Sequence, residues 1–201
     1  MSRDEDRNAK LAAGRGRLAP IKLAHVVRRT SRFDEMLAWY QSVLGADVVH
    51  SDGMLAFLTY DDEHHRIAIA GIPGLADQPP LAAGTDHVAF THADLGDLLH
   101  TYARLKSEGI EPYWCINHGP TTSMYYKDPD GNRIELQVDN FPTAEETNRW
   151  IRSGGFAANP IGVVFNPEDL LARYRSGQPI EELTMRPPLP AGATPFDMLR
   201  F

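Results

Sequence analysis

Two histidines and one glutamate occupy positions from which they could hold a metal ion. His25 and His87 each lie in a short apolar segment typical of a strand, and Glu135 lies in the alternating segment RIELQV. Two imidazoles and a carboxylate on one side of a metal are the ligand set of non-haem Fe(II) sites, and three protein ligands plus solvent also suit catalytic zinc. Taken singly, each has a simpler explanation. Most strand glutamates face water, and a histidine in an apolar run is often a core residue.

The elements around these residues form two copies of one βαβββ unit. In the first copy, about residues 19–72, a strand at 23–27 leads into a helix, and three further strands follow. In the second, about residues 84–140, the first strand begins at His87 and the same order recurs. Repeats determine architecture, so we expect an α+β fold whose two sheets pair around a shared cleft.

Aligning the two copies brings the three candidate ligands to matched positions. RIAIAG aligned with RIELQV puts Ala68 opposite Glu135, and the two first strands put His25 opposite His87. Of four equivalent positions facing the cleft, three carry ligand side chains and the fourth is Ala68. A structural zinc site is closed by a fourth protein ligand, so this pattern favours a metal that must also bind substrate or oxygen.

Over residues 20–140 the chain resembles the vicinal oxygen chelate superfamily, whose fold consists of paired βαβββ modules. The stretch INHGPTTSMYYKDPDGNRIE is similar to the signature of type I extradiol ring-cleavage dioxygenases, and EHHRIAIA resembles their segment with an active-site histidine. The signature is a histidine, a spacer, an apolar residue before tyrosine, a proline–glycine turn and the ligand glutamate, here His118, Met124, Tyr125, Pro129, Gly131 and Glu135. With two modules rather than four, the chain resembles the small, one-domain branch.

This resemblance implies a catechol extradiol dioxygenase that uses O2 as co-substrate in aromatic compound degradation. His25, His87 and Glu135 are expected to bind Fe(II), with Mn(II) as the alternative metal. A catechol is expected to chelate the metal through its two vicinal oxygens, and the ring opens beside the diol.

Three further residues receive catalytic roles from the same resemblance. His65 is expected to be the acid/base that handles a catechol proton. His118 is expected to stabilise the bound oxygen, and Tyr125 to donate a hydrogen bond to a substrate oxygen. Histidine titrates near neutrality and tyrosine is a fixed donor, so both suit these roles.

Two other functions remain open at this point. A glyoxalase-like isomerase or lyase would use zinc or nickel and a fourth protein ligand, which Ala68 cannot supply. A non-catalytic small-molecule binding protein of the same fold would need neither the three ligands nor His118 and Tyr125.

Composition limits the partners and the compartment. The net charge of −7 argues against nucleic acid or an anionic membrane as the main partner. No apolar run approaches the roughly 20 residues of a membrane span, and the charged first residues lack the apolar h-region expected of a secretory signal. The single Cys115 excludes an intrachain disulfide framework and fits a reducing compartment. We expect a cytoplasmic homo-oligomer that acts on a small molecule.

The two ends of the chain differ in composition from the repeat. Residues 1–18 are charged and are expected to form a flexible tail, so the catalytic domain is expected to cover 19–140. Residues 141–201 are expected to form a helical and irregular extension, with helices beginning near Thr143 and Asn166. This extension is expected to pack on the domain or on a partner subunit.

Overall fold

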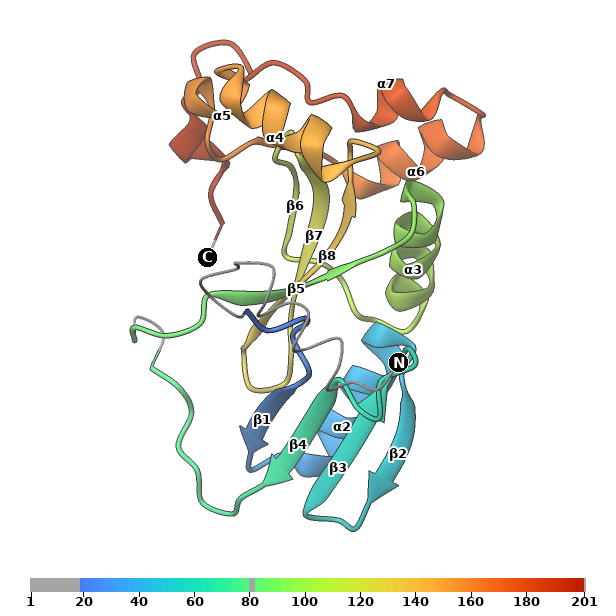
Figure 1. Cartoon of the computed structure of the whole chain (residues 1–201), viewed down its shortest axis with the longest axis vertical. Coiled ribbons are helices and arrows are strands. Elements are labelled where there is room, and N and C mark those ends of the chain that lie inside the picture. The colour runs from blue at the N-terminus through green and yellow to red at the C-terminus, as the bar shows by residue number, and fades with distance from the viewer. Residues whose placement is uncertain (1–18, 80–81, 201) are drawn as a thin grey trace, which may run out of the picture.

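Two sheets and the helices packed on them form the body of the protein (Figure 1). The computed structural model describes residues 19–79 and 82–200, so the predicted tail at 1–18 lies outside the described residues. The first sheet has the order β1-β4-β3-β2, with β1 at Val26–Thr30, β2 at Asp47–Ser51, β3 at Leu55–Thr59 and β4 at Ile67–Gly71. The second has the order β5-β8-β7-β6-β9, with β5 at His87–Thr91, β6 at Trp114–Asn117, β7 at Thr121–Lys127, β8 at Arg133–Asp139 and β9 at Val163–Val164. The predicted α+β fold with two βαβββ modules is confirmed.

One helix from each module covers one face of its sheet. Helix α2 (Phe33–Leu44) buries Met36, Tyr40 and Val43, and helix α3 (Leu95–Ser107) buries a similar apolar stripe. Residues of both helices and both sheets belong to one hydrophobic core. The hydroxyl of Tyr40 donates to Asp128 Oδ2 at 3.0 Å, which ties α2 to the β7–β8 turn. The two modules are therefore joined through their helix-covered faces.

The strand registers establish the alignment of the two modules. In the first sheet, Ala68 is the partner of Val27 on one side and of Phe57 on the other. In the second, Glu135 is the partner of Ala89 and of Tyr125 in the same arrangement. Ala68 and Glu135 are thus structurally equivalent, as the sequence alignment predicted.

The first strand begins later than the sequence predicted. The prediction was a strand at 23–27, whereas β1 starts at Val26, whose N–H donates to the Arg66 carbonyl at 2.9 Å. The residues before it are held by the Arg66 side chain instead of by strand pairing. His25 therefore lies immediately before the strand and is exposed.

The C-terminal extension packs on the second sheet. Its elements are α4 (Ala144–Arg152), α5 (Gly155–Ala158), β9, α6 (Pro167–Arg175), α7 (Ile180–Thr184) and a 3₁₀ turn at Pro195–Met198. Thr143 and Asn166 cap α4 and α6, as predicted. The proline-rich end is more ordered than its composition indicated, because Met198 is buried and its carbonyl accepts from Trp114 Nε1 at 2.9 Å. None of the helices in the described ranges has the length and hydropathy needed to cross a bilayer.

Gly162 lets the extension approach the strand that carries His118. Its φ is +122°, and a Cβ at this position would lie 2.5 Å from the carbonyl oxygen of Asn117. We expect Gly162→Ala to lower the free energy of unfolding by about 2–3 kcal/mol, since it adds a backbone clash to an unfavourable φ. Urea denaturation measures this, with Gly177→Ala as the control. Gly177 has a φ of +80° and open space around its Cβ position, so its loss should be clearly smaller. Equal losses would contradict the proposed close packing.

Candidate active site

The second sheet brings together one predicted metal ligand pair. His87 Nε2 lies 3.0 Å from Glu135 Oε2, and the Glu135 side chain is only 5% exposed. On its other side, His87 Nδ1 donates to Asp86 Oδ2 at 2.7 Å. Asp86 is in turn held by Arg133 Nη1 at 2.9 Å. The ring of His87 is therefore fixed with Nε2 directed at the Glu135 carboxylate, and Asp86 is a site residue that the sequence reasoning missed.

The same face of the sheet carries the predicted pair of His118 and Tyr125. His118 Nε2 is 3.0 Å from the Tyr125 hydroxyl, and His118 Nδ1 bonds to the carbonyl of Ile161. A carbonyl can only accept, so Nδ1 carries the hydrogen and Nε2 accepts from Tyr125. Burial lowers the pKa of His118, while burial and the nearby Glu135 charge raise the pKa of Tyr125. At neutral pH the pair is thus a neutral imidazole and a protonated phenol.

The C-terminal extension fixes the loop that follows His118. The Arg186 guanidinium donates to the carbonyls of His118 at 3.1 Å and Asn159 at 2.8 Å. It also lies over the ring of Trp150, 4.9 Å from the centroid. The extension thus supplies both the Arg186 side chain that holds the backbone at His118 and the Ile161 carbonyl that orients the His118 ring.

The first sheet gathers the other predicted residues into a separate cluster. The ring centroids of His25 and His65 are 4.4 Å apart, and His65 also stacks on Phe57 at 4.5 Å. His64 Nδ1 and His65 Nδ1 share a hydrogen bond at 2.6 Å. Burial and the neighbouring His25 and His64 lower the pKa of His65, which favours its neutral form.

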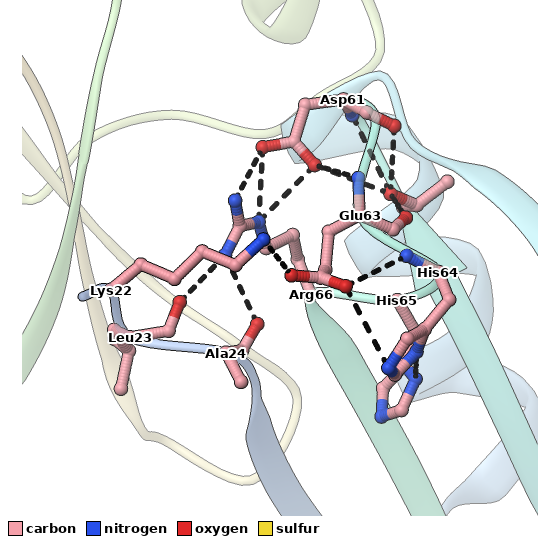
Figure 2. Close-up of polar contacts among 9 residues, drawn as sticks. Lys22, Leu23, Ala24, Asp61, Glu63, His64, His65 and Arg66 are labelled. Carbon is pink, nitrogen blue, oxygen red and sulfur yellow. Dashed lines mark hydrogen bonds and ion pairs between the residues drawn. The ribbon is translucent and has the colours of Figure 1, made fainter. Parts of the chain in front are cut away.

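A tether between two segments places His25 beside His65. Arg66 donates to the carbonyls of Leu23, at 2.6 Å, and Ala24, at 3.1 Å. Both contacts are drawn in Figure 2. The Arg66 guanidinium is held in turn by Asp61, at 2.9 Å from Nη2. Lys22 and Glu63 form a second ion pair across the same gap. The segment before β1 is thereby aligned with the segment before β4, one histidine on each.

The two clusters are not joined within one chain. In the parts of the chain that the structure describes, no group of three His, Cys, Asp or Glu side chains is arranged to hold a metal. His87 pairs with Glu135, whereas His25 pairs with His65. The strand faces beside both clusters are open, since Val27 is 53% exposed and Ala89 is also exposed. The shared cleft expected from the repeat is thus present as two separate halves.

A cavity beside the extension does not coincide with either half. This cavity of about 910 Å³ lies where β5 and β8 end and is lined by Phe141, Trp150 and Arg186 among others. None of the predicted ligands or catalytic residues lines it. The candidate active site is therefore identified by the contacts among the predicted residues and not by this cavity.

Comparison with known proteins supports the predicted enzyme class. Residues 22–136 match the Glyoxalase/Bleomycin resistance protein/Dioxygenase superfamily. The chain is 48% identical to biphenyl-2,3-diol 1,2-dioxygenase 2 of Rhodococcus globerulus over 83% of this chain and 88% of the relative. It is 46% identical to biphenyl-2,3-diol 1,2-dioxygenase 3 of the same organism, over 82% and 88%. The expectation of a dioxygenase is confirmed at the level of enzyme class.

Solved structures bear on the fold alone. A fosfomycin resistance protein from Listeria monocytogenes superimposes with a TM-score of 0.50 at 21% identity, covering 64% of this chain and 99% of that protein.

Proposed function

The chain belongs to the glyoxalase/bleomycin resistance protein/dioxygenase superfamily, and we propose that within it the protein is an extradiol dioxygenase that cleaves the ring of a catechol with O2. The observation that carries this proposal is the 48% and 46% identity to two biphenyl-2,3-diol 1,2-dioxygenases, combined with the His87–Glu135 and His118–Tyr125 contacts. The proposed role is aromatic compound degradation. The proposed setting is the cytoplasm, with which the free, buried Cys115 is compatible.

We propose that His25, His87 and Glu135 hold Fe(II), with Mn(II) as the alternative. The His87–Glu135 pair fits this role, because metal bonds of about 2.0–2.2 Å bring neighbouring ligand atoms roughly 3 Å apart, and Nε2 and Oε2 are 3.0 Å apart. Asp86 fixes the ring through Nδ1, as outer partners of metal-bound histidines commonly do. Bound metal would supply the electronic path between catechol and oxygen.

The remaining residues would bind substrate and handle protons. Tyr125 keeps its hydrogen, so its hydroxyl can donate to a substrate oxygen. His118 is fixed at Nδ1 by a carbonyl, which leaves Nε2 as the atom that can accept and return a proton. His65, whose lowered pKa favours the neutral imidazole, would accept a catechol proton beside His25.

We propose further that a second copy of this chain completes the site. Each chain carries one half with His25 and His65 and another with His87 and Glu135, and each half lies on an open strand face. In a dimer with two-fold symmetry, the first half of one copy meets the second half of its partner, and the same contact occurs twice. Such a dimer would contain two complete sites. The equivalence of Ala68 and Glu135 supports this pairing. At the same strand position, the second sheet supplies the Glu135 carboxylate, and the small side chain of Ala68 on the first sheet leaves room for it.

Oxygen uptake tests the proposed activity. The protein is reconstituted anaerobically with Fe(II) and then given O2 and a panel running from catechol and protocatechuate through L-DOPA to 2,3-dihydroxybiphenyl. We expect oxygen consumption with a new yellow chromophore from at least one catechol. Bound metal without uptake for any catechol would refute ring cleavage and favour an isomerase, a lyase or a binding role.

A further inference from the structure

The hydroxyl of Tyr113 is buried without a hydrogen-bond partner. Among the described residues, this oxygen is the one buried side-chain polar atom that has no hydrogen-bond partner. Leaving a buried hydroxyl unpaired destabilises a protein, whereas phenylalanine would fill the same space without that cost. The hydroxyl therefore needs an explanation that the fold alone does not supply.

Tyr113 packs beside Tyr125 of the candidate active site. Its backbone N–H donates to the carbonyl of Tyr125 at 2.9 Å, and the two ring centroids are 6.4 Å apart. Both rings pack in one small apolar cluster with Met198 of the extension. Lys127 Nζ lies 4.6 Å from the centroid of the Tyr113 ring. Packing thus fixes the phenol of Tyr113 beside Tyr125.

The surroundings of the hydroxyl keep it a hydrogen-bond donor. Burial raises the pKa of Tyr113, and the charge of Arg133 opposes this while Asp86 and Glu135 add to it. These three charged residues are the ones that surround the proposed metal ligand His87. The hydroxyl therefore shares their electrostatic environment without being bonded to any of them.

We propose that Tyr113 is a substrate-contacting residue whose hydroxyl donates a hydrogen bond to an oxygen of the bound catechol, beside Tyr125. This role rests on the proposed function, since the missing partner is supplied by the substrate. It assigns a second tyrosine donor to the site. Substrate binding would then relieve the cost that the free protein carries at this position.

Tyr113→Phe tests the role through binding and stability together. Catechol affinity is measured by anaerobic calorimetry on the metal-loaded full-length protein, and the melting temperature is measured without substrate. We expect catechol affinity to fall about tenfold or more, the effect of a lost hydrogen bond to a charged partner. We expect the melting temperature to stay the same or rise by roughly 2–4 °C, because an unpaired buried group has been removed.

Tyr126→Phe is the matched control. Tyr126 is buried on the opposite, helix-covered side of the same sheet, where its hydroxyl lies 4.0 Å from Met124 Sδ. We expect this variant to bind catechol as the wild type does.

Three outcomes would overturn the role of Tyr113. The first is unchanged catechol affinity in Tyr113→Phe. The second is a lower melting temperature, which would mean that the hydroxyl already has a partner in the free protein. The third is an equal loss of affinity in Tyr126→Phe. A wild-type protein that binds no catechol would instead refute the proposed function, and the role of Tyr113 with it.

Discussion

Mixing two inactive variants, His25→Ala and Glu135→Ala, will restore about a quarter of wild-type oxygen uptake if the site lies between two copies of the chain. Random reassociation makes half of the dimers mixed. In each mixed dimer, the intact His25 half of one copy meets the intact Glu135 half of the other, so one of its two sites is complete. Sites formed within one chain would recover nothing, because every chain would lack a ligand. The two variants are co-expressed with different tags, and the whole population is assayed. Doubly tagged dimers purified from it should reach about half of wild-type uptake, because each of them has one complete site of two.

A second mixture controls for subunit exchange. His87→Ala and Glu135→Ala both damage the same half of the site, because these two side chains lie 3.0 Å apart. A mixed dimer of this pair has no complete site, so we expect no recovery of activity. Recovery in both mixtures, or in neither although mixed dimers form, would contradict a site shared between copies.

The repeat and its equivalent positions could be predicted from the sequence because both depend on local pattern. Strand alternation set the register that makes Ala68 and Glu135 equivalent, and the structure has that register. Helix caps such as Thr143 are also local, since the capping oxygen lies within one turn of the N–H that it accepts from.

The arrangement of the two modules could not be predicted in the same way. It depends on contacts between residues far apart in sequence, such as the hydrogen bond from Tyr40 to Asp128. The repeat predicted that two sheets with matched ligands share one cleft. A closed two-fold dimer satisfies the same pattern with the halves on different copies, so the pattern alone does not distinguish the two arrangements.

The extension's contribution was also beyond pattern analysis. Strand β9 has two residues, too few for a periodic signal, yet it places the Ile161 carbonyl against His118. Arg186 lies in a proline-rich segment that gave no expectation of a contact with the site. Asp86, which lies outside the extension, could have been found from the sequence. It directly precedes His87, and metal-binding histidines commonly donate their other ring N–H to a carboxylate.

Glu135→Ala is expected to abolish both metal binding and ring cleavage. Loss of a metal ligand should weaken Fe(II) affinity by more than the 10- to 100-fold, approximately, that loss of an outer partner causes. Asp86→Asn should fall within that smaller range, because it leaves both ligand atoms in place and alters only the orientation of His87. Metal content after dialysis and Fe(II) titration measure the difference, and oxygen uptake should follow the same order.

Two further variants test whether the loss of Fe(II) comes from the Glu135 carboxylate itself, and not from lost packing or from a general change in net charge. Glu135→Gln keeps the volume of a side chain that is 5% exposed, so a matching loss of Fe(II) in this variant identifies the carboxylate charge as the cause. Glu108→Ala removes an exposed carboxylate that pairs with Arg104 on α3, and it should bind metal as the wild type does. If Glu135→Ala keeps its iron and its activity, the carboxylate is not a ligand. The face that holds His87 would then need a different role, since no other carboxylate in the described residues is bonded to Nε2 of that histidine.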